Sequence, residues 1–275
     1  MPELPEVEYA RRCLERWLVG VRIERASASP GRPLRGVTPE EIARTLPGRT
    51  VREVKRHGKQ LLWSLDRGLG VHLHLGMTGK IVRRRAGAEP ARHSRLRLAL
   101  GDGDAVELVD PRRFGRFELG PLARLEALPE LQSLGPDALD EAPDGPGLAR
   151  LMRGKRPLKV ALMDQRRLAG LGNIQASESL FRARLSPRAR PADLRPADWR
   201  RLSRAIQASL AHTLRAAPPP GEGDIHYVEE GGGEAPPNPF LVYRREGEPC
   251  PRCGEPIART VQAQRSTYHC PSCQH

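Results

Sequence analysis

The chain has 275 residues, which is enough for one large domain or two modest domains with a sizeable core. Its 46 Lys and Arg residues against 33 Asp and Glu residues give a net charge of +13, which fits a polyanionic partner such as nucleic acid. A hydrophobic fraction of 38% with a mean hydropathy of −0.54 excludes a membrane protein, and the acidic residues 1–6 lack the apolar segment of a secretory signal. We therefore expect a soluble, cytoplasmic protein.

The positive charge has a second explanation. Only five of the basic residues are lysine and 41 are arginine, a bias that a GC-rich genome produces without selection for binding. The charge by itself therefore favours a nucleic-acid partner only slightly over an ordinary basic enzyme.

The first 120 residues predict one helix followed by short strands. Apolar residues recur every three or four positions over residues 3–19, which predicts a helix. From about residue 20 to 120 the pattern has a period of two, most clearly at 71–75 and 95–100, and Gly and Asp turns separate the segments. Short strands at this spacing indicate a sandwich or a barrel.

The second half of the chain predicts helices and then a long loop. Residues 121–135 look like a connector, and helices are expected around 158–163, up to Phe181, and over 197–216. The segment 218–239 is rich in Pro and Gly and poor in apolar residues. A loop of this length is either a linker or a functional lid.

Four of the five cysteines form a metal-binding pattern. Cys250 and Cys253 are followed, after sixteen residues, by Cys270 and Cys273, which is the spacing of a four-thiolate zinc ribbon. Two disulfides are the alternative, and the lack of a secretory signal disfavours them. A closed four-cysteine site has no open coordination position, so we expect one structural Zn²⁺. The fifth cysteine, Cys13, lies on a helical pattern and is expected to be a small buried hydrophobe.

The N-terminal residues could carry chemistry. An N-terminal Met-Pro is normally trimmed, which would leave a secondary amine on Pro2. An α-amine has a pKa of about 7.7–8, so a share of it is nucleophilic at neutral pH and could attack the anomeric carbon of a sugar. Glu3 could protonate the ring oxygen of that sugar, with Glu6 one helical turn further along. On these residues alone, an ordinary solvated tail is the simpler interpretation.

Motifs along the whole chain resemble the formamidopyrimidine-DNA glycosylases, the bacterial enzymes that excise oxidised purines. The matching blocks occur in the family's order, at residues 1–8, 56–62, 74–79, 110–115, 162–165, 170–174 and 250–273. The resemblance implies an α+β fold. It predicts an N-terminal catalytic helix and β-sandwich domain (1–130), a helix–two-turns–helix domain with a lesion-recognition lid at about 218–239 (131–239), and a C-terminal zinc finger built on a β-hairpin (240–275).

The resemblance also assigns catalytic roles. Pro2 is expected to be the nucleophile and Glu3 the general acid, while Glu6 is expected to support the site. Lys59, counted with both the catalytic and the DNA-binding residues, is expected to reach a phosphate beside the lesion. An ordinary solvated lysine at the end of a strand is the alternative for Lys59.

Further residues are expected to bind DNA. Met77, Arg112 and Phe114 match the side chains that fill the space left when the damaged nucleotide is rotated out of the duplex. Core packing is the alternative for the two apolar residues, although the neighbours of Phe114 make a core position unusual. Asn173, in a glycine-rich turn, and Arg265, between the two cysteine pairs, match phosphate-contacting residues.

The chain departs from the family pattern at three places. Gln175 stands where Tyr is expected, and Gln264 stands before Arg265 where Gly is usual. In the lid, residues 223–228 and 236–239 differ from the commoner pattern.

These features predict a DNA-repair enzyme that is both a glycosylase and a lyase. It would excise 8-oxoguanine and formamidopyrimidines from damaged double-stranded DNA and cut the abasic strand by β,δ-elimination through a Schiff base on Pro2. We expect the protein to be a monomer in the bacterial cytoplasm, associated with the nucleoid and not with a membrane. One alternative is an endonuclease VIII-like glycosylase for oxidised pyrimidines, against which Leu4 argues, as do Met77, Arg112 and Phe114 together. The other is a non-catalytic damage-sensing protein, against which the Pro2 and Glu3 pair argues.

Overall fold

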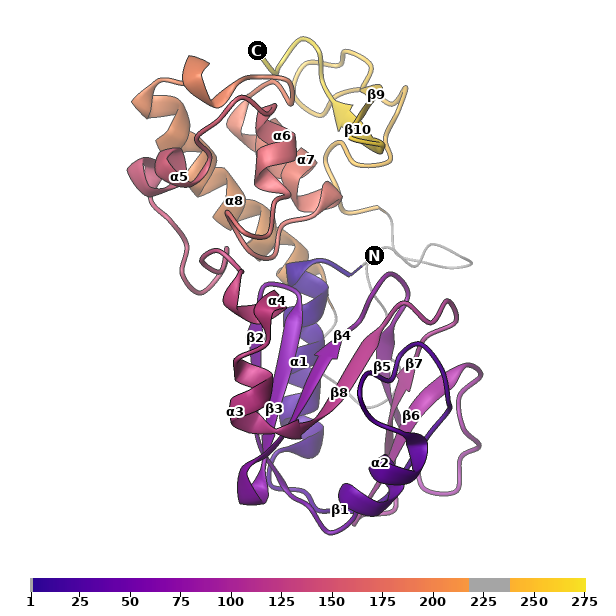
Figure 1. The fold of residues 1–275 in the computed structure, drawn as a ribbon. Coiled ribbons are helices and arrows are strands. Elements are labelled where there is room, and N and C mark those ends of the chain that lie inside the picture. Colours follow the sequence, from indigo (N-terminus) through magenta and orange to yellow (C-terminus); the bar gives the residue numbers. More distant parts are fainter. Residues whose placement is uncertain (1, 218–237) are drawn as a thin grey trace. The chain divides into compact units, whose positions relative to one another are not determined.

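The computed structural model describes residues 2–217 and 238–275, which form two compact units (Figure 1). The first unit contains Glu6–Gln132 with residues 2 and 217, and the second contains Glu3–Pro5, Ser133–Ala216 and 238–275. The predicted lid lies outside the described residues except for positions 238 and 239. Among the described helices, none has the length and apolar character that crossing a membrane requires.

The first unit is a β-sandwich with a helix packed against its core. One antiparallel sheet has the order β1-β6-β7-β5, and the other has the order β2-β3-β4-β8. The strands of the first sheet are Ile23–Ala28, Ser94–Leu100, Ala105–Val109 and Lys80–Arg84. Those of the second are Val51–His57, Gln60–Leu65, Leu69–His74 and Arg116–Pro121.

Helix α1 (Leu4–Leu18) supplies an apolar face to the core of the sandwich. Its residues from Val7 to Leu18, including a fully buried Cys13, belong to one cluster with the inward-facing residues of both sheets. The period-two alternation indicated a sandwich or a barrel, the family resemblance implied a sandwich, and the structure has the sandwich. The expectation that Cys13 is buried is confirmed. A short helix α2 (Pro39–Thr45), capped by Thr38, and the 3₁₀ turn η1 (Asp66–Gly68) connect the strands.

Residues 121–135, interpreted from the sequence as a connector, contain two short helices that the sequence did not predict. They are α3 (Leu122–Glu126) and α4 (Pro129–Gln132). Leu122 and Leu125 pack so closely on β4 that a Cβ added at Gly70 would lie 2.9 Å and 3.2 Å from their Cδ1 atoms. Packing on the sheet therefore stabilises α3, and both helices are too short to show a helical period.

The second unit is helical with a β-hairpin at its C-terminal end (Figure 1). Its helices are α5 (Gly145–Leu151), α6 (Leu158–Leu162), α7 (Asn173–Ala183) and α8 (Pro196–Ala216), with the 3₁₀ turn η2 (Pro191–Asp193). They share one apolar core, so the helices predicted at 158–163, up to Phe181 and over 197–216 are confirmed. The hairpin pairs β9 (Ala258–Gln262) with β10 (Arg265–His269), which confirms the predicted α+β fold class.

Candidate active site and DNA-binding residues

The carboxylate of Glu3 is held by the N-terminus of α7. It accepts hydrogen bonds from the backbone N–H groups of Gly172 at 2.9 Å, Ile174 at 2.8 Å and Gln175 at 3.0 Å. The first turn of a helix has N–H groups without intrahelical partners and a positive dipole end, so it suits a carboxylate. These bonds fix a buried carboxyl group directly beside Pro2 in the chain.

The glycines of the Gly-Leu-Gly turn are required by these contacts. A Cβ at Gly172 would lie 2.3 Å from Glu3 Oε1, and a Cβ at Gly170, where φ is +109°, would lie 2.2 Å from Leu4 Cδ1. Leu4 N–H also donates to the carbonyl of Gly170. In the structure, the close approach to these glycines is that of the chain's own residues 3 and 4.

Two other N-terminal candidates, Pro2 and Glu6, belong to the first unit. Both are buried, and Glu6 lies in the first turn of α1. The Pro2 nitrogen becomes a secondary amine only when Met1 is removed, because it is otherwise an amide.

Lys59 lies in the tight turn between β2 and β3, half-buried. Arg56 supports this turn, since its Nη1 donates to the carbonyl of Gly58 at 3.1 Å and its Nε donates to Glu8 Oε2 at 3.1 Å. Glu8 lies on α1, so a buried ion pair anchors the turn that carries Lys59 to that helix.

Asp110 joins the loops at 75–79 and 110–115. Its fully buried carboxylate accepts hydrogen bonds from Thr78 Oγ1 and from the Gly115 N–H, both at 2.7 Å. The two loops touch: a Cβ at Gly76, where φ is +64°, would lie 2.4 Å from the carbonyl carbon of Phe114. Motifs more than thirty residues apart thus form one loop pair.

Met77 and Phe114 are exposed on this loop pair. Each is 40% exposed, whereas most large apolar side chains of the described chain are buried. The Arg112 guanidinium lies 4.9 Å from the centre of the Phe114 ring, a cation–π contact. Three residues before Met77 in the chain, His74 accepts a hydrogen bond at Nδ1 from the Gly76 N–H. Burial lowers the pKa of His74 to about 4, which keeps this nitrogen unprotonated.

The four ribbon cysteines converge on one point. Their Sγ atoms lie within 4.8 Å of one another, with Cys253 and Cys270 3.5 Å apart and Cys250 and Cys273 4.0 Å apart. Sulfurs around a tetrahedral Zn²⁺ stand about 3.8 Å apart, given bonds of about 2.3 Å. The residues therefore fit one structural zinc, as the spacing predicted.

The zinc ribbon is docked on α7. Cys250 and Cys270 share an apolar cluster with Phe181, and the Arg252 guanidinium lies 4.4 Å from the centre of the Phe181 ring. On the same helix, Glu178 accepts hydrogen bonds from three consecutive N–H groups, those of Leu241, Val242 and Tyr243.

A buried lysine that the sequence interpretation missed connects α7 to the hairpin. Lys159 Nζ donates to Asn173 Oδ1 at 2.6 Å, to Thr267 Oγ1 at 2.6 Å and to the carbonyl of Ser266 at 3.1 Å. Burial lowers the pKa of Lys159 to about 8, although the Glu3 charge opposes the shift; the charge of Arg265 adds to it. The sequence did contain a clue to Lys159, because it is one of only five lysines in a chain with 41 arginines.

Asn173 is itself engaged with the hairpin. Its Nδ2 donates to the carbonyl of Ser266 at 2.9 Å, in addition to the bond that its Oδ1 accepts. An amide nitrogen has two hydrogens, so a second remains for another acceptor. Arg265 is exposed at the hairpin tip, directly after the turn.

The two single-residue departures from the family pattern have clear environments. Gln175 is buried between α7 and α8, donating to Thr213 Oγ1 and accepting from Ser209 Oγ, both at 2.8 Å. Gln264 and Ala263 form the two-residue hairpin turn with φ values of +60° and +47°. Both central residues are therefore left-handed, as in a type I′ turn, but without glycine.

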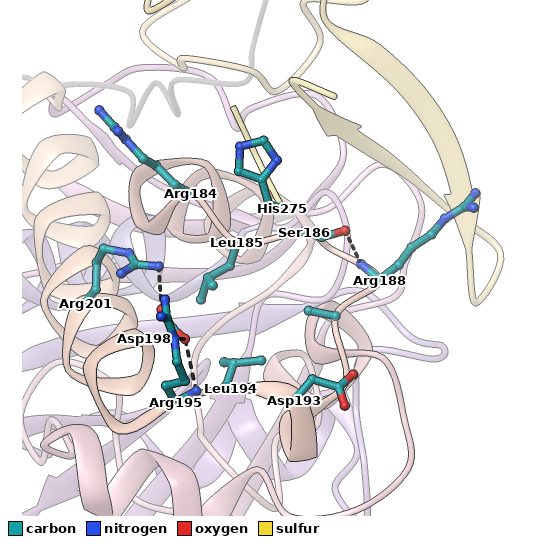
Figure 2. A pocket seen from close by; sticks show the side chains of 11 residues that line it. Arg184, Leu185, Ser186, Arg188, Asp193, Leu194, Arg195, Asp198, Arg201 and His275 are labelled. Carbon is teal, nitrogen blue, oxygen red and sulfur yellow. Dashed lines mark hydrogen bonds and ion pairs between the residues drawn. The ribbon is translucent and has the colours of Figure 1, made fainter. Parts of the chain in front are cut away.

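A cavity of about 840 Å³ in the second unit contains none of the predicted site residues (Figure 2). Four of its eleven lining residues are arginines, and Asp198 accepts hydrogen bonds from Arg201 Nη2 at 2.8 Å and from Arg195 Nε at 3.3 Å. Part of its positive charge is thus already paired.

Comparisons with known proteins agree with this geometry. Three family models match consecutive parts of the chain: the formamidopyrimidine-DNA glycosylase N-terminal domain over residues 1–117, its H2TH domain over 134–218, and the zinc finger found in FPG and IleRS over 247–275. The formamidopyrimidine-DNA glycosylase of Gluconobacter oxydans is 40% identical over 281 residues, covering all of both chains. That of Thermus thermophilus is 40% identical over 275 residues, covering 100% of this chain and 98% of its own.

Solved structures match over the same length. The crystal structure of the MutM (FPG) protein from Thermus thermophilus has a TM-score of 0.80 at 39% identity, covering 99% of this chain and 98% of its own. The Lactococcus lactis Fpg in complex with DNA that contains an abasic site has a TM-score of 0.86 at 27% identity, with full coverage of both chains.

The fold, the zinc ribbon and these matches define the class of protein. It is a DNA-repair enzyme, a DNA glycosylase with an associated lyase activity at abasic sites. The chain belongs to the formamidopyrimidine-DNA glycosylase family, which confirms the resemblance seen in the motifs.

Proposed function

We propose that this chain removes oxidised purines from duplex DNA with Pro2 as the nucleophile and Glu3 as the general acid. The observation that carries the proposal is the triple hydrogen bond that holds the Glu3 carboxyl group beside Pro2 in the chain. Solved relatives support the substrate class, since one is bound to Fapy-dG containing DNA and another to DNA with carbocyclic 8-oxo-G.

The chemistry follows from an amine and an acid next to a sugar. The Pro2 amine adds to C1′ of the damaged nucleotide, and the base leaves with the electron pair of its glycosidic bond. Glu3 donates a proton to O4′, the ring opens, and an iminium links Pro2 to the sugar. Loss of a C2′ proton expels the 3′ phosphate, and a second elimination expels the 5′ phosphate, so the strand is cut on both sides. In this scheme Glu6 supports the site as a second acidic group near the nucleophile.

DNA contacts are proposed for each unit separately. In the first unit, Lys59 contacts a phosphate, while Met77, Arg112 and Phe114 fill the space that the everted nucleotide leaves. The exposure of two neighbouring apolar side chains on one loop pair supports this role, because clustered exposed apolar groups usually mark an interaction site.

In the second unit, we propose that Arg265 and Asn173 contact phosphate. Exposure of Arg265 at the hairpin tip and the remaining amide hydrogen of Asn173 support these roles. Lys159 holds the hairpin against α7 and so positions both residues. The zinc held by the four cysteines supplies no chemistry and stabilises the hairpin that carries Arg265.

Three further proposals concern organisation. We propose three domains, 1–130, 131–239 and 240–275, which the family matches at 1–117, 134–218 and 247–275 support. We also propose that the protein acts as a monomer, which light scattering of the DNA complex would test. The bacterial sources of its relatives support a place at the nucleoid in the cytoplasm, away from membranes.

Borohydride trapping tests the proposed chemistry. We expect a covalent adduct between the trimmed protein and duplexes that contain 8-oxoguanine or an abasic site, because borohydride reduces the iminium. The matched control is the same chain with Met1 retained, whose Pro2 nitrogen is an amide, and it should give no adduct.

The outcomes separate the alternatives. No adduct on either duplex, with binding to abasic DNA intact, would leave a damage-sensing protein and contradict catalysis by Pro2. Faster excision of thymine glycol than of 8-oxoguanine would instead indicate a pyrimidine-directed enzyme.

A further inference from the structure

Three side chains with metal-ligating atoms converge in the first unit, on residues that the proposed DNA chemistry does not use. His72 on β4 lies directly opposite Glu118 on β8 in the antiparallel register, and Glu130 comes from α4. One ring nitrogen of His72 and one carboxylate oxygen of each glutamate all lie within 4.8 Å of one another.

The protonation state of His72 leaves a lone pair facing these carboxylates. Its Nε2 lies 3.0 Å from Gln60 Oε1, and a carbonyl oxygen can only accept, so Nε2 carries the proton. The other nitrogen, Nδ1, is buried without a hydrogen-bond partner among the described residues and lies 3.9 Å from Glu118 Oε1. The ring is fully buried, which disfavours its charged, doubly protonated form.

The charged side chains near His72 are those of Glu118, Glu130, Arg35, Arg116 and Arg124. Arg124 on α3 also lies near Glu118, with its Nη1 3.7 Å from Oε2. The oxygen of Glu118 that lies near His72 is the other one, Oε1. The charges of Arg116 and Arg35 lower the pKa of His72, and that of Glu130 raises it. A lone pair and two acidic groups therefore meet, and no described residue donates a hydrogen bond to His72 Nδ1.

We propose that His72, Glu118 and Glu130 bind a second metal ion, a divalent cation of the zinc type. Neutral imidazole and carboxylates are ligands that Zn²⁺ accepts, and three protein ligands leave one position for water. A metal-bound histidine usually donates its other ring N–H to a neighbouring acceptor, as His72 does to Gln60.

The geometry needs only a small adjustment. Ligand atoms around a tetrahedral Zn²⁺ stand about 3.4 Å apart, so the three atoms would close by about 1 Å. Glu130 can supply most of this shift, because it is partly exposed on a helix of four residues. A cavity of about 330 Å³, lined by Gln60 together with Leu131 and Gln132, offers a route for the ion.

A metal ion here would have a structural effect. It would fix α4, the last helix of the first unit, to strands β4 and β8 of the sheet. The inference is independent of the proposed DNA chemistry, since none of the three ligands takes part in it.

Metal content of the full-length protein tests the proposal. After incubation with Zn²⁺ and dialysis, we expect two zinc ions per chain by elemental analysis. His72→Gln and Glu118→Gln should each reduce the content to one. The matched control is Glu53→Gln on β2, which removes the same charge as Glu118→Gln from an exposed position outside the cluster and should keep two.

A second measurement does not depend on how well a variant folds. Modification of the thiols with a mercurial should release one of the two ions from the wild-type protein, because only the ribbon zinc is bound by cysteine. One zinc per chain in the wild type would overturn the proposal. Two ions in both ligand variants would overturn it as well, since the second ion would then lie elsewhere.

Discussion

The carboxylate of Glu3 accepts a hydrogen bond from the backbone N–H of Gly172, 169 residues further along the chain. The distance is 2.9 Å, and a Cβ at position 172 would lie 2.3 Å from Oε1 of the same carboxylate. The orientation of the proposed general acid is thus set by a turn in the middle of the sequence, at the start of α7.

Gly172→Ala should therefore impair catalysis although no catalytic residue is substituted. The added methyl group must displace Glu3, so we expect excision of 8-oxoguanine to slow by about tenfold or more, equivalent to about 1.4 kcal/mol. The measurement is single-turnover kinetics on a lesion-containing duplex. Gly101→Ala is the control, because its Cβ would lie 3.7 Å from its nearest neighbour, and it should act like the wild type. An unchanged rate in Gly172→Ala would contradict the role of this contact.

The sequence predicted best those features that local pattern or chemistry requires. The strand at 95–100 alternates clearly, and the four cysteines must keep their spacing to bind one metal ion, so both were found correctly. The short helices α3 and α4 were missed, because helices of five and four residues cannot show a period, and α3 is stabilised by packing of Leu122 and Leu125 on the sheet.

Long-range contacts of single side chains could not be predicted in the same way. Lys159 bonds to Ser266 and Thr267, more than one hundred residues away, and no local pattern encodes that distance. The motifs therefore indicated which residues matter, whereas their mutual positioning by Lys159 and by the turn at Gly172 required the fold.

Lys159 should make stability depend on pH above neutrality. Its pKa is lowered from 10.5 to about 8 in the folded protein, so between these values the unfolded chain binds more protons. The contribution of Lys159 to the free energy of unfolding should therefore rise with pH over this window, by about 1–3 kcal/mol, and stay constant below it.

The check is a comparison of wild type and Lys159→Met by denaturant unfolding at pH 7.5 and pH 10. The stability of the wild type relative to the variant should increase at the higher pH. Lys55→Met, at an exposed position on β2, shows the general effect of losing a lysine. A difference that is the same at both pH values would contradict the burial of a charged Lys159.

Gln264→Gly should stabilise the hairpin. Gln264 has a φ of +60°, where a residue with a Cβ is strained by about 1–2 kcal/mol relative to glycine. Part of this gain is offset by the greater freedom of glycine in the unfolded chain, so we expect about 0.5–1 kcal/mol. Hydrogen exchange of the β9 and β10 amides measures the local opening energy. Gln262→Gly, within β9, should have the opposite sign, and equal effects of the two changes would exclude turn strain as the cause.

Zinc removal should abolish DNA binding by the hairpin while the first unit stays folded. Cys250 and Cys270 are buried against Phe181, so without the metal four thiols and their apolar neighbours lose their organising centre. Cys270→Ser should lose the ribbon zinc and weaken binding to abasic duplex by at least about tenfold, equivalent to about 1.4 kcal/mol. Cys13→Ala, a buried cysteine outside the ribbon, should keep both zinc and binding. Full affinity in zinc-free protein would refute the structural role.

Two phenylalanines three positions apart distinguish insertion into DNA from core packing. Phe114 is 40% exposed on the loop pair, whereas Phe117 on β8 is fully buried in the sandwich core. Phe114→Ala should change the free energy of unfolding by less than about 0.5 kcal/mol, and Phe117→Ala should lower it by about 3–5 kcal/mol. Everting a nucleotide costs a few kcal/mol of stacking, so losing the Phe114 ring should still slow excision by about tenfold or more. Unfolding curves and single-turnover excision on the same variants provide the test. If Phe114→Ala loses stability and activity in proportion, the side chain supports the fold; if activity alone falls, it acts on DNA.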